Sequence, residues 1–210
     1  KQRGGSRQPQ RGRPGPNPTF KFGEECIEMK NSSINTGGAV GIGAALFFVL
    51  GRFVAIPSGI PNTNISLQYA ILGMLGGMYG PVAGGLIGFI GHTLIDLSWG
   101  GSPWWSWVIA STLVGIVVGL GAKKLALNEG DFGKKKFALF AVINIVANAV
   151  AWVLVAPTLD ILIYAEPAGK VFSPGVCAAI AHSLTAVIVG GLLVAAYCKT
   201  IAKKGSLDKD

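Results

Sequence analysis

The chain has 210 residues, of which 50% are hydrophobic and only 13% are charged, and its mean hydropathy is +0.52. A soluble domain of this length carries about a quarter charged residues, so the composition excludes an ordinary soluble protein and favours several membrane-spanning helices. The net charge of +8 does not indicate nucleic-acid binding, because six of the 18 Lys and Arg residues precede Met29 and most of the others flank apolar segments.

Residues 1–28 differ in composition from the rest of the chain. They are rich in Pro, Gly, Arg and Gln and contain no apolar run, which is typical of disordered segments. They also lack the apolar region of a signal peptide. Met29 resembles a natural start. We therefore expect residues 1–28 to be a disordered leader, either artificially added or read out of frame, and residues 29–210 to form a membrane domain.

Six apolar segments follow and predict an all-α membrane protein with six transmembrane helices. A spanning helix needs about 20 apolar residues, and the second and third segments are short by that measure. Pro81 suits the first turn of a helix and follows Gly76, Gly77 and Gly80. We expect a tight turn there, with a single continuous helix as the alternative. The six segments are 36–56, 65–80, 81–97, 104–123, 136–157 and 175–198.

The distribution of lysines predicts the orientation in the membrane. The connection between the fourth and fifth segments and the C-terminal end are Lys-rich, whereas the 1–2, 3–4 and 5–6 connections hold only Arg52 and Lys170. By the positive-inside rule, both termini and the 4–5 connection are cytoplasmic and the other three connections face outward. The lysines concerned are Lys123, Lys124, Lys134, Lys135, Lys136, Lys199, Lys203, Lys204 and Lys209.

The first segment carries small residues spaced four apart, which allow another membrane helix to approach closely. That helix could belong to this bundle or to another protein. Similar pairs occur at Gly84/Gly88 and Gly115/Gly119, so the spacing alone does not decide. The small residues of the first segment are Gly37, Ala39, Gly41, Gly43 and Ala45.

The outward connections hold unusual concentrations of polar and aromatic residues. The first contains two prolines, ends in amide and hydroxyl side chains, and is followed by Gln68 one turn into the next segment. The 3–4 connection holds four of the five tryptophans, which predicts a lid or stacking surface for a ligand. The alternative is an interfacial aromatic belt. The residues concerned are Asn62, Thr63, Asn64, Trp99, Trp104, Trp105 and Trp107.

A few polar residues interrupt the apolar segments. His92 and Asp96 are four apart and share one helix face, as do Asn144 and Asn148. His182 stands alone. Because polar groups are costly in lipid, such residues face a cavity or a neighbouring helix. We expect the two pairs to contact a substrate, with hydrogen bonding between helices as the alternative.

No enzyme signature is present in the sequence. It contains no GxSxG, HExxH or Walker A motif, and the three cysteines have no metal-binding spacing. We therefore expect no catalytic residue, no metal site and no cofactor bound by this chain.

Three strings resemble a known family: GIGAALFFVLGRFVAIPSGIPNTNI, YGPVAGGLIGFIGH and GGSPWWSWV. Together with the six segments and the basic 4–5 connection, they resemble the S component of an energy-coupling factor (ECF) transporter of the riboflavin-type superfamily. The resemblance covers residues 29 to about 200. It implies a substrate-binding subunit in the bacterial plasma membrane that reorients to deliver its substrate.

The resemblance also implies partners and a substrate class. S components act with a transmembrane coupling subunit and two cytoplasmic ATPases, which use ATP and Mg. The small-residue motif of the family corresponds here to Ala39 and Gly43, with Gly41 and Ala45 as an adjacent register. The branch resembles cobalamin-specific S components, so cobalamin is the expected substrate. Riboflavin, a pyrimidine vitamin precursor and a methionine-related compound remain alternatives, and a membrane scaffold or assembly factor is an alternative of another class.

Overall fold

The structure is a computed structural model that describes residues 18–57, 59 and 64–207, with the side chains of 18–33 and 202–207 left out. The chain divides into two compact units, residues 1–35 and 36–210. Helix α1 spans Pro18–Phe53. The backbone of residues 18–28, which the sequence assigns to the leader, is therefore helical, and residues 1–17 lie outside the described residues.

The second unit is built almost entirely from helices, as the sequence predicts. A two-stranded antiparallel hairpin follows α1 and pairs Ile56 with Ile65 and Pro57 with Asn64. After α1, the elements are β1 Ile56–Pro57, β2 Asn64–Ile65, α2 Gln68–Tyr79, α3 Pro81–Ser98, α4 Trp105–Leu120, α5 Ala122–Leu125, η1 Leu127–Glu129, α6 Lys134–Ala149, η2 Val150–Val155, α7 Ala156–Tyr164, α8 Ala168–Thr185, η3 Ala186–Gly190 and α9 Gly191–Leu207.

Four helical segments in the described part of the chain are long and apolar enough to cross a membrane. A fifth is added if α4 and the α5–η1 segment, bent by 43°, form one span. Helix α2 has 12 residues, fewer than the ~20 of a full span. The chain is therefore a multi-pass α-helical membrane protein. The four segments are Ile34–Phe53, Pro81–Ser98, Lys134–Tyr164 and Ala168–Ile201.

The tight turn predicted at residues 79–81 is confirmed. Helix α2 ends at Tyr79, and Pro81 begins α3. Gly80 between them has φ 89°, a backbone conformation that residues with a Cβ rarely adopt. The Pro81 ring also lacks the backbone donor that a continuous helix would use at this position, so both residues favour the break.

Helices α3 and α4 pack with their backbones in direct contact along a seam of glycines. A Cβ added at Gly84 would overlap the carbonyl of Gly115, and one added at Gly88 would overlap the carbonyl of Ser111. Gly119 likewise packs on the backbone of Gly80 and Pro81. Two of the small-residue pairs seen in the sequence are therefore used for packing within the bundle.

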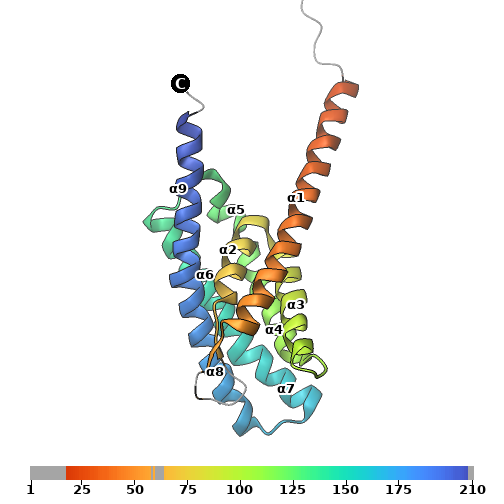
Figure 1. Cartoon of the computed structure of the whole chain (residues 1–210), viewed down its shortest axis with the longest axis vertical. Helices are drawn as coiled ribbons and strands as arrows, with labels where there is room; N and C mark the ends of the chain where they lie inside the picture. Colours follow the sequence, from red (N-terminus) through yellow and green to blue (C-terminus); the bar gives the residue numbers. More distant parts are fainter. Residues whose placement is uncertain (1–17, 58, 60–63, 208–210) are drawn as a thin grey trace, which may run out of the picture. The chain divides into compact units, whose positions relative to one another are not determined.

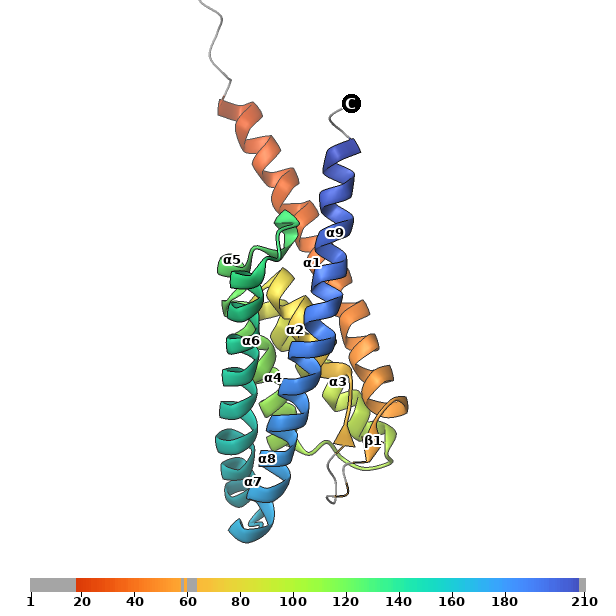
Figure 2. The same ribbon diagram turned by 90° about the vertical axis from the view of Figure 1, so that its left-hand side faces the viewer.

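The fifth and sixth apolar segments extend beyond their predicted bounds. Each is one long helical stretch with a π-helical insert: η2 joins α6 to α7, and η3 joins α8 to α9. Figure 2 shows both stretches, and α6 packs against α8. Because the first stretch continues to Tyr164, it includes Asp160 within the apolar span Lys134–Tyr164.

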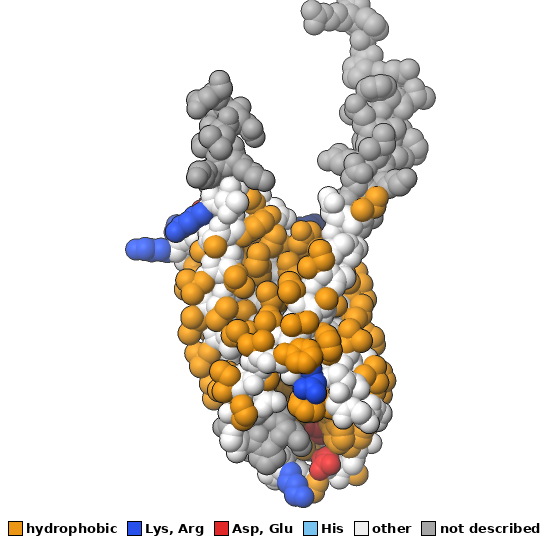
Figure 3. All heavy atoms as spheres, viewed as in Figure 1, with side chains coloured by type: hydrophobic (Ala, Val, Ile, Leu, Met, Phe, Trp, Pro, Cys, Tyr) orange, Lys and Arg blue, Asp and Glu red, His pale blue; other side chains and the backbone are white. Residues whose placement is uncertain are grey.

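Within residues 36–210, different elements form the two ends of the bundle. Figure 1 shows α5 and the end of α9 at one end and α7 with the β1–β2 hairpin at the other. Between them, the outer surface is apolar: Figure 3 shows hydrophobic side chains over most of the visible face. Examples are Ile42 and Val82, which are 65% and 71% exposed. Such a surface suits contact with lipid tails.

Candidate functional site

A cavity of about 950 Å³ lies at the α7 and hairpin end of the bundle. Its size is near the upper end of the ~300–1,000 Å³ range of small-molecule sites. Its lining combines aromatic rings with polar side chains from helices far apart in the sequence. The lining residues are Gly51, Asn64, Ser66, Gln68, Tyr69, His92, Ile95, Asp96, Trp99, Trp104, Trp107, Trp152, Asp160, Glu166, Lys170, Val171, Ser173, Pro174, Ala178 and His182.

Three aromatic rings pack together along one wall of the cavity. The Tyr69 ring of α2 stacks on the His182 imidazole of α8, with centroids 3.7 Å apart. The Trp152 indole meets both rings edge-on, at 6.0 Å and 4.9 Å. Trp152 lies in η2, and π-helical inserts of this kind are frequent at functional sites. The insert therefore belongs to the part of the fold that forms the cavity.

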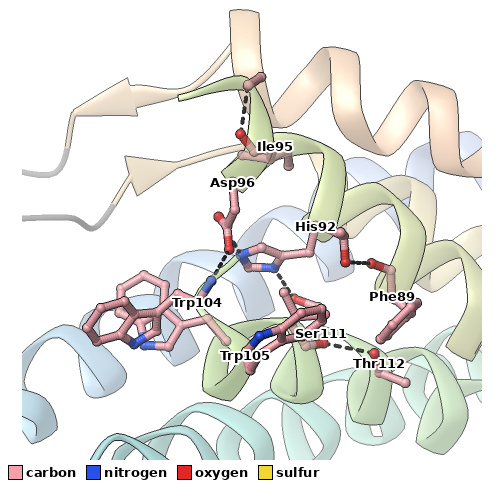
Figure 4. Close-up of polar contacts among 12 residues, drawn as sticks. Phe89, His92, Ile95, Asp96, Trp104, Trp105, Ser111 and Thr112 are labelled. Atoms are coloured by element: carbon pink, nitrogen blue, oxygen red, sulfur yellow. Dashed lines mark hydrogen bonds and ion pairs between the residues drawn. The ribbon is translucent and has the colours of Figure 1, made fainter. Parts of the chain in front are cut away.

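A chain of polar contacts runs from Tyr69 of α2 to Asp96, near the end of α3. The Tyr69 hydroxyl is hydrogen-bonded to Ser111 Oγ at 2.7 Å, and His92 Nδ1 contacts the same oxygen at 2.5 Å. On its other side, His92 Nε2 lies 3.7 Å from Asp96 Oδ1. Figure 4 shows His92 between Ser111 and Asp96. Both ring nitrogens of His92 therefore face polar groups of this protein.

The start of α4 is fastened to α3 and α7. The backbone N–H of Trp104 donates to Asp96 Oδ2 at 2.8 Å, as Figure 4 shows. The next backbone N–H, of Trp105, donates to the Tyr164 hydroxyl at 2.8 Å. The Trp104 indole stacks on the Tyr164 ring with centroids 4.0 Å apart. These bonds satisfy N–H groups that the first turn of a helix leaves without internal partners.

Three buried polar atoms of lining residues have no hydrogen-bond partner among the described residues. They are Gln68 Oε1, Trp152 Nε1 and His182 Nδ1. Their side chains are 6%, 1% and 6% exposed. An unpaired buried polar group costs about 1–3 kcal/mol, so the arrangement favours a ligand that supplies both donors and acceptors.

Six of the predicted substrate residues line this cavity: Asn64, Gln68, His92, Asp96, Trp99 and Trp104. They lie in β2, α2, α3 and the connection between α3 and α4, so the fold brings together parts that are apart in the sequence. Asn62 and Thr63 lie outside the described residues. Their role and that of the six lining residues in binding stay predictions.

Three other predicted residues lie away from the cavity lining. Trp105 is 42% exposed and stacks on Phe89 at 6.3 Å. Asn144 and Asn148 are fully buried in α6, and each donates its side-chain N–H to the backbone carbonyl four residues earlier, at 2.9 Å. Both hydrogen bonds run within α6, so neither is the bond between helices that the alternative predicts. The role of these three residues in binding stays a prediction.

Sequence reasoning did not select several residues that line the cavity, above all Tyr69 and Asp160. Tyr69 gave no signal, because one tyrosine near the start of an apolar segment is common. Asp160 had one: it is an acidic residue in a long apolar stretch, and ionisable residues within spans usually have a function. It was missed because the fifth segment was predicted to end at residue 157. Trp107, which the sequence placed on the predicted stacking surface, does line the cavity, and so does His182, which was noted only as a lone polar residue.

The small residues of α1 divide into two sets. Gly43 is buried, and a Cβ there would lie 2.7 Å from side-chain atoms of Leu75 and Ile87. Gly37 and Gly41 have no described atom within 4 Å of an added Cβ, and Ala45 is exposed on the same side, whereas Ala39 is half-buried. Gly43 thus packs inside the bundle, and the register of Gly41 and Ala45 faces outward. The role of either register in binding a partner stays a prediction.

Among the described residues, no group of three or more His, Cys, Asp or Glu side chains is placed to hold a metal ion.

Comparison with known proteins identifies the family. The family described as "ECF-type riboflavin transporter, S component" matches residues 31–199. A UPF0397 protein of Clostridium perfringens is 53% identical over 184 residues, which cover 88% of this chain and 100% of the relative. A UPF0397 protein of Enterococcus faecalis is 50% identical over 178 residues, covering 85% and 97% of the two chains. No solved structure gives a significant match. The chain therefore belongs to the S-component family of ECF-type transporters, whose members are substrate-binding membrane subunits.

Proposed function

We propose that this chain is the high-affinity substrate-binding subunit of an ECF-type importer for a vitamin, with cobalamin as its substrate. The observation that carries the proposal is the cavity of about 950 Å³, which combines aromatic faces with unpaired polar atoms. Aromatic faces suit a conjugated ligand, and aromatic contacts add ~0.5–1.5 kcal/mol beyond area burial.

The choice of cobalamin rests on the resemblance to cobalamin-specific S components and on the size of the cavity. Riboflavin is the main competitor, because the matching family carries that vitamin in its description. It is also flat and bears donors and acceptors along its edges. A pyrimidine vitamin precursor or a methionine-related compound would leave much of the cavity unfilled.

Transport would need partners that this chain does not supply. In the proposed importer, a transmembrane coupling subunit binds the outward small-residue face of α1, and two cytoplasmic ATPases provide energy from ATP and Mg. The chain would cross the plasma membrane of a bacterium six times, with both termini inside, and would reorient to release its substrate. The lysine-rich 4–5 connection and C-terminal end support this orientation.

The first experiment identifies the ligand directly. We would purify the protein gently, release any bound molecule by denaturation and measure its mass. Release of a corrinoid is the expected result. Release of riboflavin would replace the proposed substrate but keep the proposed class. If no vitamin is released and none binds saturably on titration, the scaffold alternative is favoured.

A pair of tryptophan variants tests whether the cavity is the substrate site. Trp104→Ala should weaken binding of the identified vitamin about tenfold, which corresponds to ~1.4 kcal/mol. Trp105→Ala is the matched control, because Trp105 lies outside the cavity lining and contacts Phe89. Equal losses in both variants would favour a membrane-interface role for these tryptophans.

Vesicle transport tests the dependence on partners. The chain alone should bind substrate but should not accumulate it when ATP is added inside the vesicles. ATP-driven uptake by the chain without other subunits would contradict the proposal.

A further inference from the structure

Asp160 of α7 is the most deeply buried acidic side chain at the cavity. It is 4% exposed and lies in the apolar stretch Lys134–Tyr164. Among the described side chains, no Lys or Arg forms an ion pair with it. Burying a carboxyl group in such surroundings is costly unless hydrogen-bond donors surround it.

Three donors from the start of α4 converge on this carboxyl. The Trp104 indole N–H donates to Oδ1 at 2.7 Å, and the Ser106 hydroxyl donates to the same oxygen. The Trp107 indole N–H donates to Oδ2 at 3.1 Å. An indole nitrogen can only donate, so both tryptophans need an acceptor at this place. The carboxyl needs no proton of its own to make all three bonds.

The two indoles held in this way both line the cavity. The Trp104 ring also stacks on Tyr164, which lies one turn after Asp160 on the same helix. The Trp107 ring meets Trp152 edge-on at 5.5 Å, so it links the start of α4 to the aromatic wall. The orientation of both rings is therefore set from α7, across 53 to 56 residues of sequence.

We propose that Asp160 is a positioning residue of the substrate site, which fixes the rings of Trp104 and Trp107 in the orientation that the substrate meets. This inference rests on the proposed function, since it assigns a role within the same site. A carboxylate fits because each of its oxygens accepts from a different indole. An asparagine has one oxygen and one NH₂ group, so one indole N–H would face another donor.

Asp160→Asn is the central variant, with riboflavin and cyanocobalamin as probes. For whichever probe the unmodified protein binds, the dissociation constant should rise at least tenfold. Glu129→Gln, which removes an acidic charge from a side chain 73% exposed in the 4–5 connection, should bind as the unmodified protein does. An unchanged dissociation constant in Asp160→Asn would overturn the proposal.

A double-mutant comparison separates positioning from general destabilisation. Trp104→Phe with Trp107→Phe keeps two aromatic rings but removes both N–H donors. If Asp160 acts through these indoles, adding Asp160→Asn to that background should weaken binding less than threefold further. A full additional loss, equal to that in the unmodified protein, would show that Asp160 does not act through the tryptophans.

A ligand-free measurement decides the matter even if neither probe binds. With ¹⁵N-labelled tryptophan, the indole N–H signals of Trp104 and Trp107 should be protected from exchange with solvent in the unmodified protein. At least one should exchange tenfold faster in Asp160→Asn, with Trp105 as the internal reference. Unchanged exchange would overturn the inference about Asp160. Failure of both probes, with the expected exchange, would count against the proposed vitamins alone.

Discussion

Two sets of glycines in this protein share a four-residue spacing, but one set is buried between helices and the other is exposed. In the α3–α4 seam, Gly84 and Gly115 are buried, and each leaves room for the backbone of the facing helix. On α1, Gly37 and Gly41 are exposed, with no described atom within 4 Å of an added Cβ. The first set is already used for packing, whereas the second leaves space for a helix from outside the described chain.

The difference shows what a small-residue pattern does and does not indicate. Small residues permit close helix approach in membranes, where packing replaces the hydrophobic effect as the driving force. The pattern does not say which helix approaches. Gly43 illustrates this, since it lies two residues after Gly41 on the same helix but packs on Leu75 and Ile87 of the bundle. Variants at these glycines should separate the two sets by their effect on the stability of the isolated chain.

Gly115→Ala should have the largest effect. The added methyl group would overlap the carbonyl of Gly84, and a backbone carbonyl cannot move unless its helix shifts. We expect a loss of about 1–3 kcal/mol or more, seen as a lower melting temperature in detergent and a smaller folded fraction. Gly38→Ala is the control, because space is open there. Equal melting temperatures for the two variants would mean that the seam is not packed backbone to backbone.

Gly43→Leu should have an intermediate effect. The new Cβ alone would overlap the ends of Leu75 and Ile87. These ends can move more easily than backbone, so we expect a cost of about 1–3 kcal/mol. If the Ala39 and Gly43 register binds the coupling subunit, this variant should also block that association and leave substrate binding nearly intact. The packing of Gly43 adds a loss of stability, measurable as a lower melting temperature. An unchanged melting temperature would favour an outward role for Gly43.

Gly41→Leu should leave the isolated chain within about 0.5 kcal/mol of its original stability, as expected for a surface change. If the outward face of α1 binds the coupling subunit, co-purification with that subunit and vitamin uptake should both be lost. Ala149→Leu adds similar bulk to an exposed position of α6 and serves as the control. Normal uptake with Gly41→Leu would mean that this face does not bind the partner.

Gly37→Ala should have the smallest effect of all. Alanine has a somewhat higher helix propensity than glycine and is still small enough for close helix approach. We expect unchanged uptake and a melting temperature that is equal or slightly higher. A clear loss of uptake would mean that the partner contacts the bare backbone at Gly37 and would sharpen the assigned interface.

The chemistry of the cavity could be foreseen only in part. His92 with Asp96, and Trp99 with Trp104, were selected because polar residues in spans and clustered tryptophans are unusual in a sequence, and the fold brings all four to one cavity. Asn144 and Asn148 satisfied the same rule, yet they bond to the backbone of their own helix. The pattern of polar residues in a span does not distinguish these two outcomes, because it does not give the rotation of the helix against its neighbours.

The sequence by itself determined the features that depend on local interactions. The apolar runs predict membrane helices because lipid requires every backbone polar group to be bonded within the segment. The break at Gly80 and Pro81 follows from the backbone preferences of those two residues. The tertiary structure alone decided which glycines meet another helix and which tryptophans line the cavity. Trp104 and Asp160 are 56 residues apart, and their hydrogen bond depends on where α7 packs against α4. That packing is set by the sum of many side-chain contacts, which no single segment of the sequence contains.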